Sequence, residues 1–300
     1  MSITVEWLSQ ANKDIDSIEI YRRTGATATI NPNALGEPIG TVAKDVTRFI
    51  DTTVVDKNVY RYWICAVKGG NRTLNFPITQ GFFLNTGPGP KELRRGTWQY
   101  GWFGKVSNEE MFTHLEVRGL VPKLTMFSFT PDFWDKFIYN GKILFIPNKR
   151  MGITTLQVLY QAGIVYGTDN TGYNTPLNTT PVNQLTKISK NGFEYIIRLP
   201  RFVDGTQYIS QSVYNGEIRA TMSRLMEYKG SYSGQVIDGK LDNRVAADVA
   251  AQAGTWTANN YTNNAQYWTV WDPNQPELPA YVSFNTINHA FIPVFELVQP

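Results

Sequence analysis

Alternating apolar and polar residues dominate the first 86 positions of the chain. The alternating runs are residues 3–7, 18–23, 39–42, 47–50 and 59–67. Clusters of Gly, Pro, Asn and Asp separate these runs, and no helical period competes with the alternation. Short runs of this kind are typical of antiparallel strands. We therefore predict an all-β sandwich over residues 1–86.

The longest run predicts which side chains face the core of this sandwich. Even-numbered residues 60–66 share the inward face, so Cys65 points the other way. Cys65 is the sole cysteine, and no disulfide can therefore form within the chain. Neither of the two histidines, His114 and His289, is near it in sequence, which disfavours a catalytic thiol. We expect Cys65 to fill a shallow site at the surface.

The clearest boundary in the chain is the sequence Asn-Thr-Gly-Pro-Gly-Pro at residues 85–90. Two Gly-Pro steps interrupt strands and helices and leave a semi-stiff connector. We expect a linker over residues 87–95, between the sandwich and a second domain at 96–300. Arg94 and Arg95 make this linker basic, and we expect them to face solvent or a neighbouring subunit.

Strand and helix patterns mix in the second domain. Ser107 and Glu110 have the spacing of a capping box, which predicts a short helix over residues 108–117. A second amphipathic helix is predicted over residues 217–228. The further strands are predicted at residues 194–199, 281–284 and 290–298. Strands with a few short helices and no βαβ alternation indicate an α+β, strand-rich domain.

The stretch at 141–163 has the order strand, basic turn, helix. Its helix has an apolar face and ends at Gly163, a residue type that favours helix termination. Many phosphate-binding enzymes begin with this order, but the glycine spacing of a Walker A loop is absent. We therefore interpret Lys149 and Arg150 as an exposed turn or a subunit contact.

Composition narrows the function classes. Charged residues make up 18% of the 300 residues and the formal net charge is +3, without the strong basic bias of a nucleic-acid binder. No run of about 18 apolar residues is present, so we predict no membrane insertion. The first residues lack the basic and apolar regions of a secretory signal. We expect the chain to fold in a reducing cytoplasm and to have no specific nucleic-acid partner.

Candidate catalytic residues are few. Asp132 and Asp135 could act as the two acids of a glycosidase. A helix beginning at Thr-Pro-Asp, where an acidic residue is favoured by exposed amides, is the preferred interpretation. One cysteine and two distant histidines argue against a His/Cys metal site, and residues 169–172 are better explained as a turn than as a calcium site. We expect neither an enzyme nor a cofactor.

One segment has the composition of a binding surface. Residues 256–273 combine flat aromatic rings with amides and hydroxyls. Three interpretations remain open: a protein interface, a sugar-binding surface, or a partly buried loop. The candidate contact residues are Trp256, Tyr261, Tyr267, Trp268 and Trp271.

The first 86 residues resemble a fibronectin type III domain. The resemblance rests on Val-Glu-Trp, Ile-Glu-Ile-Tyr-Arg-Arg-Thr-Gly, Phe-Ile-Asp-Thr-Thr and Val-Tyr-Arg-Tyr-Trp-Ile-Cys-Ala-Val. It implies that Trp7 is the tryptophan packed under the sheet and that Tyr60 forms a tyrosine corner. The usual first strand is short or missing, which leaves a sheet edge for a partner or another part of the chain to cover.

The order of segments after the linker resembles virion structural proteins of tailed bacteriophages. The segments are "GWFGKVSNEEMFTHL", "NGKILFIPNKR", "TTLQVLYQAGIVYG", "FEYIIRLP", "IRATMSRLMEYKGSYS" and the terminal "FIPVFELV". The resemblance covers about residues 98–228 and 290–298. At residues 230–235 the chain has Gly-Ser-Tyr-Ser-Gly-Gln where relatives often have a longer signature, so the subgroup stays open.

The phage resemblance implies a neck, collar, tail or appendage protein that assembles as a ring or trimer. Its partners would be copies of itself and other virion proteins, in a virion assembled in the host cytoplasm. Two alternatives stay open. One is a host-surface glycan-binding module that uses the aromatic segment, and the other, disfavoured, is a polysaccharide-cleaving enzyme that uses Asp132 or Asp135.

Overall fold

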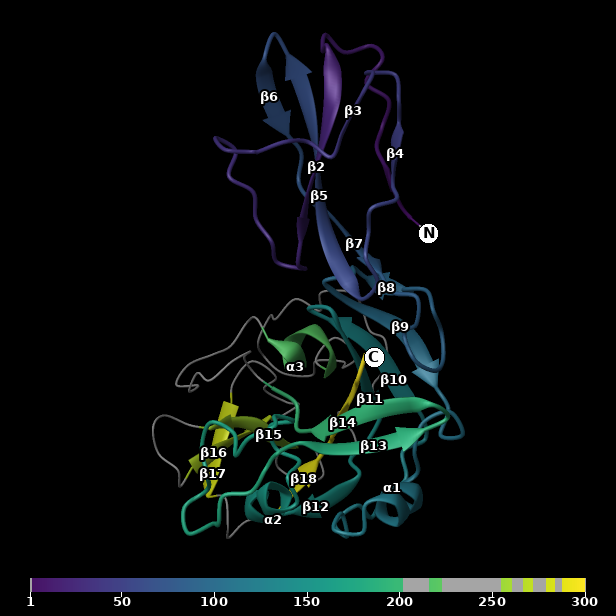
Figure 1. Cartoon of the computed structure of the whole chain (residues 1–300). Helices are drawn as coiled ribbons and strands as arrows, with labels where there is room; N and C mark the ends of the chain where they lie inside the picture. Colours follow the sequence, from purple (N-terminus) through teal and green to yellow (C-terminus); the bar gives the residue numbers. More distant parts are fainter. Residues whose placement is uncertain are drawn as a thin grey trace, which may run out of the picture. The chain divides into compact units, whose positions relative to one another are not determined.

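Strands dominate the architecture of the chain, which was determined as a computed structural model (Figure 1). The structure describes residues 2–201, 216–222, 255–260, 267–271, 279–283 and 288–299. The chain divides into two compact units. The first contains residues 1–86 and 96–100, and the second contains 87–95 and 101–300. Within the described ranges three helices are present and all are short, so the predicted strand-rich fold with few helices is confirmed.

The first unit consists of two sheets. Its strands are β1 (Ile3–Glu6), β2 (Ser17–Thr24), β3 (Gly40–Val42), β4 (Arg48–Asp51), β5 (Asn58–Lys68), β6 (Asn71–Leu74) and β7 (Ile78–Phe82). β1 and β4 pair antiparallel as one sheet. β3, β2 and β5 form the other sheet, in which β6 pairs with the end of β5 and β7 with its beginning.

The core of the first unit lies between these sheets. Ile3 and Val5 of β1 pack in one cluster with Tyr60, Tyr62 and Ile64 of β5. The prediction that the even-numbered residues of this strand face inward is therefore confirmed for these three positions. Their alternation on one strand places three large side chains on the same face, where they are removed from water.

The expectation that Cys65 lies at the surface was wrong. Its exposed fraction is 0%, and it packs in a second cluster with Tyr21, Leu35 and Trp63. Residues 25–35 cover the outer face of the β2–β5 sheet at this point, because Leu35 and the partly buried Ile30 belong to the same cluster. Burial raises the pKa of the Cys65 thiol, which makes the thiolate less available.

Asp51 joins the two sheets of the first unit. It ends β4 and accepts hydrogen bonds from the Arg22 guanidinium at 2.6 Å and from the Tyr62 hydroxyl at 2.8 Å. Although burial would raise the pKa of Asp51, hydrogen bonds from Thr53, Tyr62 and Arg22 hold it below its usual value. Asp51 is therefore a charged group on the β1–β4 sheet that accepts hydrogen bonds from two side chains of the other sheet.

Tyr60 ties β5 to the segment that precedes it, and its loss should weaken the first unit. The Val55 amide donates to the Tyr60 hydroxyl at 2.8 Å, and that hydroxyl donates to the Val55 carbonyl at 3.3 Å. We expect Tyr60→Phe to lower the free energy of unfolding by about 1–2 kcal/mol, because a partly buried amide and carbonyl lose their partner. Urea unfolding of the full chain measures this, with Tyr173→Phe, half-exposed in the second unit, as the control. Equal midpoints for Tyr60→Phe and the unchanged chain would contradict the expectation.

The strands after the linker segment form a seven-stranded sheet and a five-stranded sheet. They are β8 (Arg95–Gly96), β9 (Tyr100–Val106), β10 (Trp134–Tyr139), β11 (Lys142–Pro147), β12 (Gly152–Thr154), β13 (Thr186–Lys190), β14 (Phe193–Arg198), β15 (Thr255–Asn260), β16 (Tyr267–Trp271), β17 (Pro279–Ser283), β18 (His289–Phe291) and β19 (Val294–Leu297). One sheet has the order β13-β14-β19-β11-β10-β9-β8 and the other β12-β18-β15-β16-β17. β19, near the end of the chain, therefore lies inside the first of these sheets, between β14 and β11.

Two hairpins of the seven-stranded sheet use the same turn. Asn140 and Gly141 join β10 to β11, and Asn191 and Gly192 join β13 to β14. All four residues have positive φ, between 47° and 84°. Positive φ at both central residues is the requirement of a type I′ turn, whose twist matches that of the strands. The Asn-Gly sequence therefore fixes the register of both hairpins.

The predicted helices are confirmed in part. α2 (Leu156–Gln161) is capped at its start by Thr155, and Gly163 follows its end with a φ of 71°, as expected. Ser107 and Glu110 do make reciprocal hydrogen bonds, but these close a turn. The helix predicted over 108–117 is therefore present only from His114 onward, so its predicted start was wrong.

The helix that follows this turn has its own capping box. α1 (His114–Leu120) is capped by Thr113 with Glu116. Of the helix predicted over 217–228, the described part contains α3 (Glu217–Ala220), and residues 223–228 lie outside the described residues.

Candidate functional site

Four of the five aromatic candidates lie on paired strands. Trp256 is on β15, and Tyr267, Trp268 and Trp271 are on β16. The two strands pair antiparallel, with Trp256 opposite Val270 and Thr255 opposite Trp271. The backbone thus brings these positions to one hairpin. Tyr261 lies outside the described residues.

Asp132 and Asp135 occupy different surroundings. The expected helix at Thr-Pro-Asp is absent, because β10 begins at Trp134, so that prediction was wrong. Asp132 accepts from the Lys149 ammonium at 2.8 Å and from the Asn148 side-chain amide at 3.1 Å. Asp135 is buried and accepts from the Trp102 indole at 3.0 Å. The two carboxylates thus have different hydrogen-bonding partners.

The basic turn at 149–150 is engaged within the chain. Lys149 pairs with Asp132, and the Arg150 guanidinium lies 5.1 Å from the centre of the Phe129 ring. A short strand, β12, intervenes between this turn and helix α2. The turn is therefore not a direct strand-to-helix connection of the kind that cradles a phosphate.

The segment expected as a linker belongs to the second unit. Gly87 and Pro88 are buried, and the Arg94 amide donates to the Trp102 carbonyl at 2.9 Å. Arg94 and Arg95 are both solvent-accessible, as expected of them. The structure thus places residues 87–95 against the seven-stranded sheet, with their two arginines at its surface.

Lys136 holds this segment from inside the sheet. Its side chain is completely buried on β10, and its ammonium donates to the Pro88 carbonyl at 2.9 Å and the Pro90 carbonyl at 2.7 Å. The ring centre of Phe103 lies 4.9 Å from the same nitrogen. Burial and, to a smaller extent, the positive charge of Lys91 together lower the pKa of Lys136 to about 7. No sequence pattern indicates that a lysine between Asp135 and Phe137 is buried.

The most extensive buried ionic cluster centres on Arg198, the last residue of β14. Its guanidinium makes two bonds to the Glu217 carboxylate of α3, at 2.5 and 2.8 Å, and one to Glu296 of β19 at 2.8 Å. It also donates to the Leu199 carbonyl at 3.1 Å. Lys142 of β11 contacts the other oxygen of Glu296 at 2.8 Å.

The charges of this cluster stabilise one another. Arg198 has an exposed fraction of 0%, and burial alone would lower its pKa, but the carboxylates of Glu217 and Glu296 raise it. Burial would likewise raise the pKa of Glu296, but the charges of Arg198 and Lys142 lower it to about 2. Clusters of perturbed groups often mark active sites. Here every guanidinium nitrogen of Arg198 already has a partner, and the cluster joins four elements, α3, β11, β14 and β19.

The remaining candidate groups do not come together. His114 contacts the Thr130 hydroxyl at 2.6 Å, and His289 is buried on β18. Among the described residues, no three His, Cys, Asp or Glu side chains gather so as to hold a metal ion. Asp169 accepts from the Asn183 side chain at 2.7 Å, and Asn170 accepts from the Gly172 amide at 2.8 Å, a local pattern of the predicted turn.

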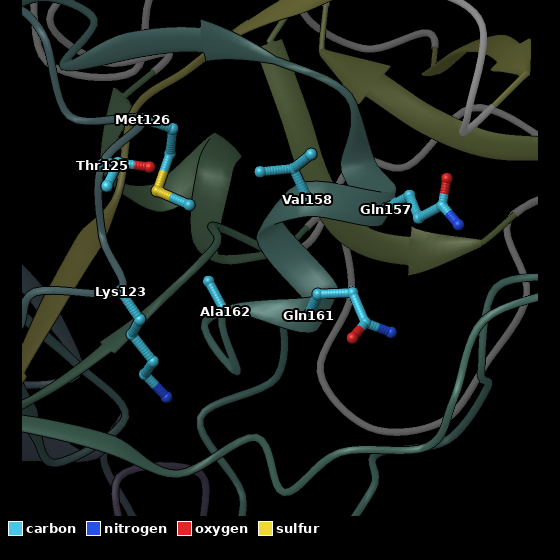
Figure 2. Close-up of a pocket in the computed structure, with 7 residues that line it drawn as sticks. All are labelled: Lys123, Thr125, Met126, Gln157, Val158, Gln161 and Ala162. Carbon is cyan, nitrogen blue, oxygen red and sulfur yellow. The ribbon is translucent and has the colours of Figure 1, made fainter.

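One pocket lies between helix α2 and the loop that follows α1. Its volume is about 330 Å³ (Figure 2). The lining residues are Lys123, Thr125, Met126, Gln157, Val158, Gln161 and Ala162. Thr125, Gln161 and Lys123 are exposed, so the pocket is open to solvent on one side. No sequence pattern predicts this pocket, because its two walls are about 30 residues apart and neither contains a known motif.

Comparison with models of known protein families gives no match, and a search of curated proteins gives none either. Within the described part of the chain, none of the helices is long and apolar enough to cross a lipid bilayer.

Proposed function

We propose that the chain is a non-enzymatic structural subunit of a tailed-bacteriophage virion, a neck, collar or tail/fibre component that acts through contacts with copies of itself and other virion proteins. The observation that carries this proposal is where the segments of the phage-like pattern lie. Residues 142–147, 193–198 and 294–297 are far apart in sequence but form the adjacent strands β11, β14 and β19. Three segments of the pattern therefore form neighbouring strands of one sheet, which supports a shared assembly fold.

The hydrogen bonds that the buried charged side chains make within the chain support a structural role. Arg198 and Lys136 use their polar atoms to hold strands and the 87–95 segment together. Large apolar side chains, in contrast, are left exposed on both units, among them Phe76, whose exposed fraction is 93%, and Leu115. Exposed apolar groups of this size are available for subunit contacts.

The first unit supports the proposal of a fibronectin type III-like module. The Tyr60 hydroxyl bonds the backbone of Val55, five residues upstream, which is the arrangement of a tyrosine corner. Trp7 packs against the core between the two sheets. Among the described residues, β1 pairs with β4 alone, so its other edge is available to a further strand. We propose that this module decorates the particle or docks on a neighbouring subunit.

Two measurements test the assembly function. Sedimentation of the purified full chain should show a trimer or a ring at micromolar concentration, and mass spectrometry of purified virions of the phage that encodes it should detect it. A protein that is absent from those virions would refute the proposal. A chain that stays monomeric but is present in virions would restrict it to assembly with other proteins.

A second candidate function is host-surface glycan binding. It is favoured by the pairing of β15 with β16, which brings Trp256, Tyr267, Trp268 and Trp271 to one hairpin. Aromatic rings on neighbouring strands are suited to stacking on the C–H faces of sugars. A glycan array probed with the full chain and with a variant in which these four and Tyr261 are replaced tests it. Glycan binding that survives all five replacements would exclude these aromatic residues as the binding site.

A further inference from the structure

Lys123 differs from most other lysines of the second unit in its surroundings. Lys142, Lys149, Lys187 and Lys190 each form a salt bridge with a carboxylate. The described part of the chain shows no such partner for Lys123, which lines the pocket beside α2. Its ammonium lies just beyond the helix, where a methyl group on Gly163 would approach it to 3.4 Å.

The C-terminal end of α2 only partly explains why the Lys123 ammonium lies there without a carboxylate partner among the described residues. Helix carbonyls favour a cation near the last turn, and that effect is small at an exposed site. Lys123 is solvent-exposed as a whole, but its partial burial against the pocket wall lowers its pKa, because part of its hydration is lost. A cation in this state is stabilised by an anion that arrives from outside.

The centre of the pocket is apolar. Figure 2 shows Met126, Val158 and Ala162 around its centre, with Lys123 on the loop side. Val158 is 42% exposed although it is a large apolar residue on a helix. The amides of Gln157 and Gln161 complete the rim on the helix side. The pocket therefore combines one cation that has no salt-bridge partner among the described residues, an apolar floor, two amides and the Thr125 hydroxyl.

We propose that this pocket is a docking site for a protein segment that presents an aliphatic side chain next to a carboxylate. The charge complements Lys123, and the aliphatic group covers Met126 and Val158. A volume of about 330 Å³ is at the lower end of ligand pockets, roughly 300–1,000 Å³. Because the pocket is open on one side, it would leave a small molecule largely in solvent, whereas an anchor side chain of a larger partner would be covered by that partner.

Short probes test the docking site directly on the full chain. The chain is labelled at its methionine methyl groups, of which Met126 reports on the pocket while the buried Met111 and Met151 report on the fold. The probes are N-acetyl-leucine, with a terminal carboxylate, and N-acetyl-leucyl-aspartate amide, with a side-chain carboxylate. We expect a saturable change in the NMR chemical shift of the Met126 methyl group with at least one of the two probes. The probe that binds more tightly identifies the kind of carboxylate that the partner presents.

Three comparisons decide the proposal. N-acetyl-leucinamide, which lacks the charge, should bind about three- to tenfold more weakly. Lys123→Met should cause a similar loss, and Val158→Glu a larger one, while Lys187→Met at an exposed, paired lysine changes nothing. Unchanged Met111 and Met151 signals confirm that each variant is folded. The proposal is overturned if neither carboxylate probe changes the Met126 methyl signal. It is also overturned if N-acetyl-leucinamide binds as tightly as the carboxylate probes.

Discussion

Replacing Arg198 with methionine will lower the free energy of unfolding of the second unit by about 3–5 kcal/mol. The guanidinium is fully buried and contacts two carboxylates, those of Glu217 and Glu296, which lie on α3 and β19. Methionine fills much of the same volume but leaves both carboxylates without their buried partner. The cost of a buried unpaired charge exceeds the gain from one more apolar side chain.

Urea unfolding of the full chain measures this change, and Arg118→Met is the matched control. Arg118 is an exposed arginine near the end of α1, so its replacement should change the free energy of unfolding by less than about 0.5 kcal/mol. Adding Glu217→Gln and Glu296→Gln to Arg198→Met should recover part of the loss, because the two charges are removed together with their partner. A cost below about 1 kcal/mol for Arg198→Met would show that water reaches the carboxylates.

The features that the sequence predicted are those decided by neighbouring residues. The alternation of residues 59–67 predicts strand β5 and its inward tyrosines, because period-two alternation needs only one buried face. The end of α2 at Gly163 is likewise local. The Asn-Gly pairs at 140–141 and 191–192 are a further local signal, because this dipeptide favours a two-residue hairpin turn.

The features that it missed depend on contacts between distant residues. Cys65 is buried because residues 25–35 return over the outer face of β5. β10 shows no alternation, since all six of its residues are buried, and its pattern therefore did not indicate a strand. Arg198 meets Glu296 across 98 positions of sequence. A single sequence contains no pattern that predicts such an ion pair between distant residues.

Raising the pH from 7 to 9 will stabilise the second unit, and Lys136→Met will abolish that increase. Burial holds the pKa of Lys136 at about 7, whereas the unfolded chain restores the ordinary value of 10.5. Between these values the unfolded chain binds one more proton than the folded chain, so the free energy of unfolding rises with pH. The rise is at most about 1.4 kcal/mol per pH unit, or about 2–3 kcal/mol over this interval.

Urea unfolding of the full chain at several pH values between 6 and 9 gives this slope. Lys187→Met, at an exposed lysine that pairs with Glu194, should keep the slope of the unchanged chain. Lys91→Met removes a positive charge that lowers the pKa of Lys136, so its stability should begin to rise at a higher pH. If Lys136→Met kept the full slope, the ammonium would be hydrated in the folded chain, and the carbonyls of Pro88 and Pro90 would not be held by a buried lysine.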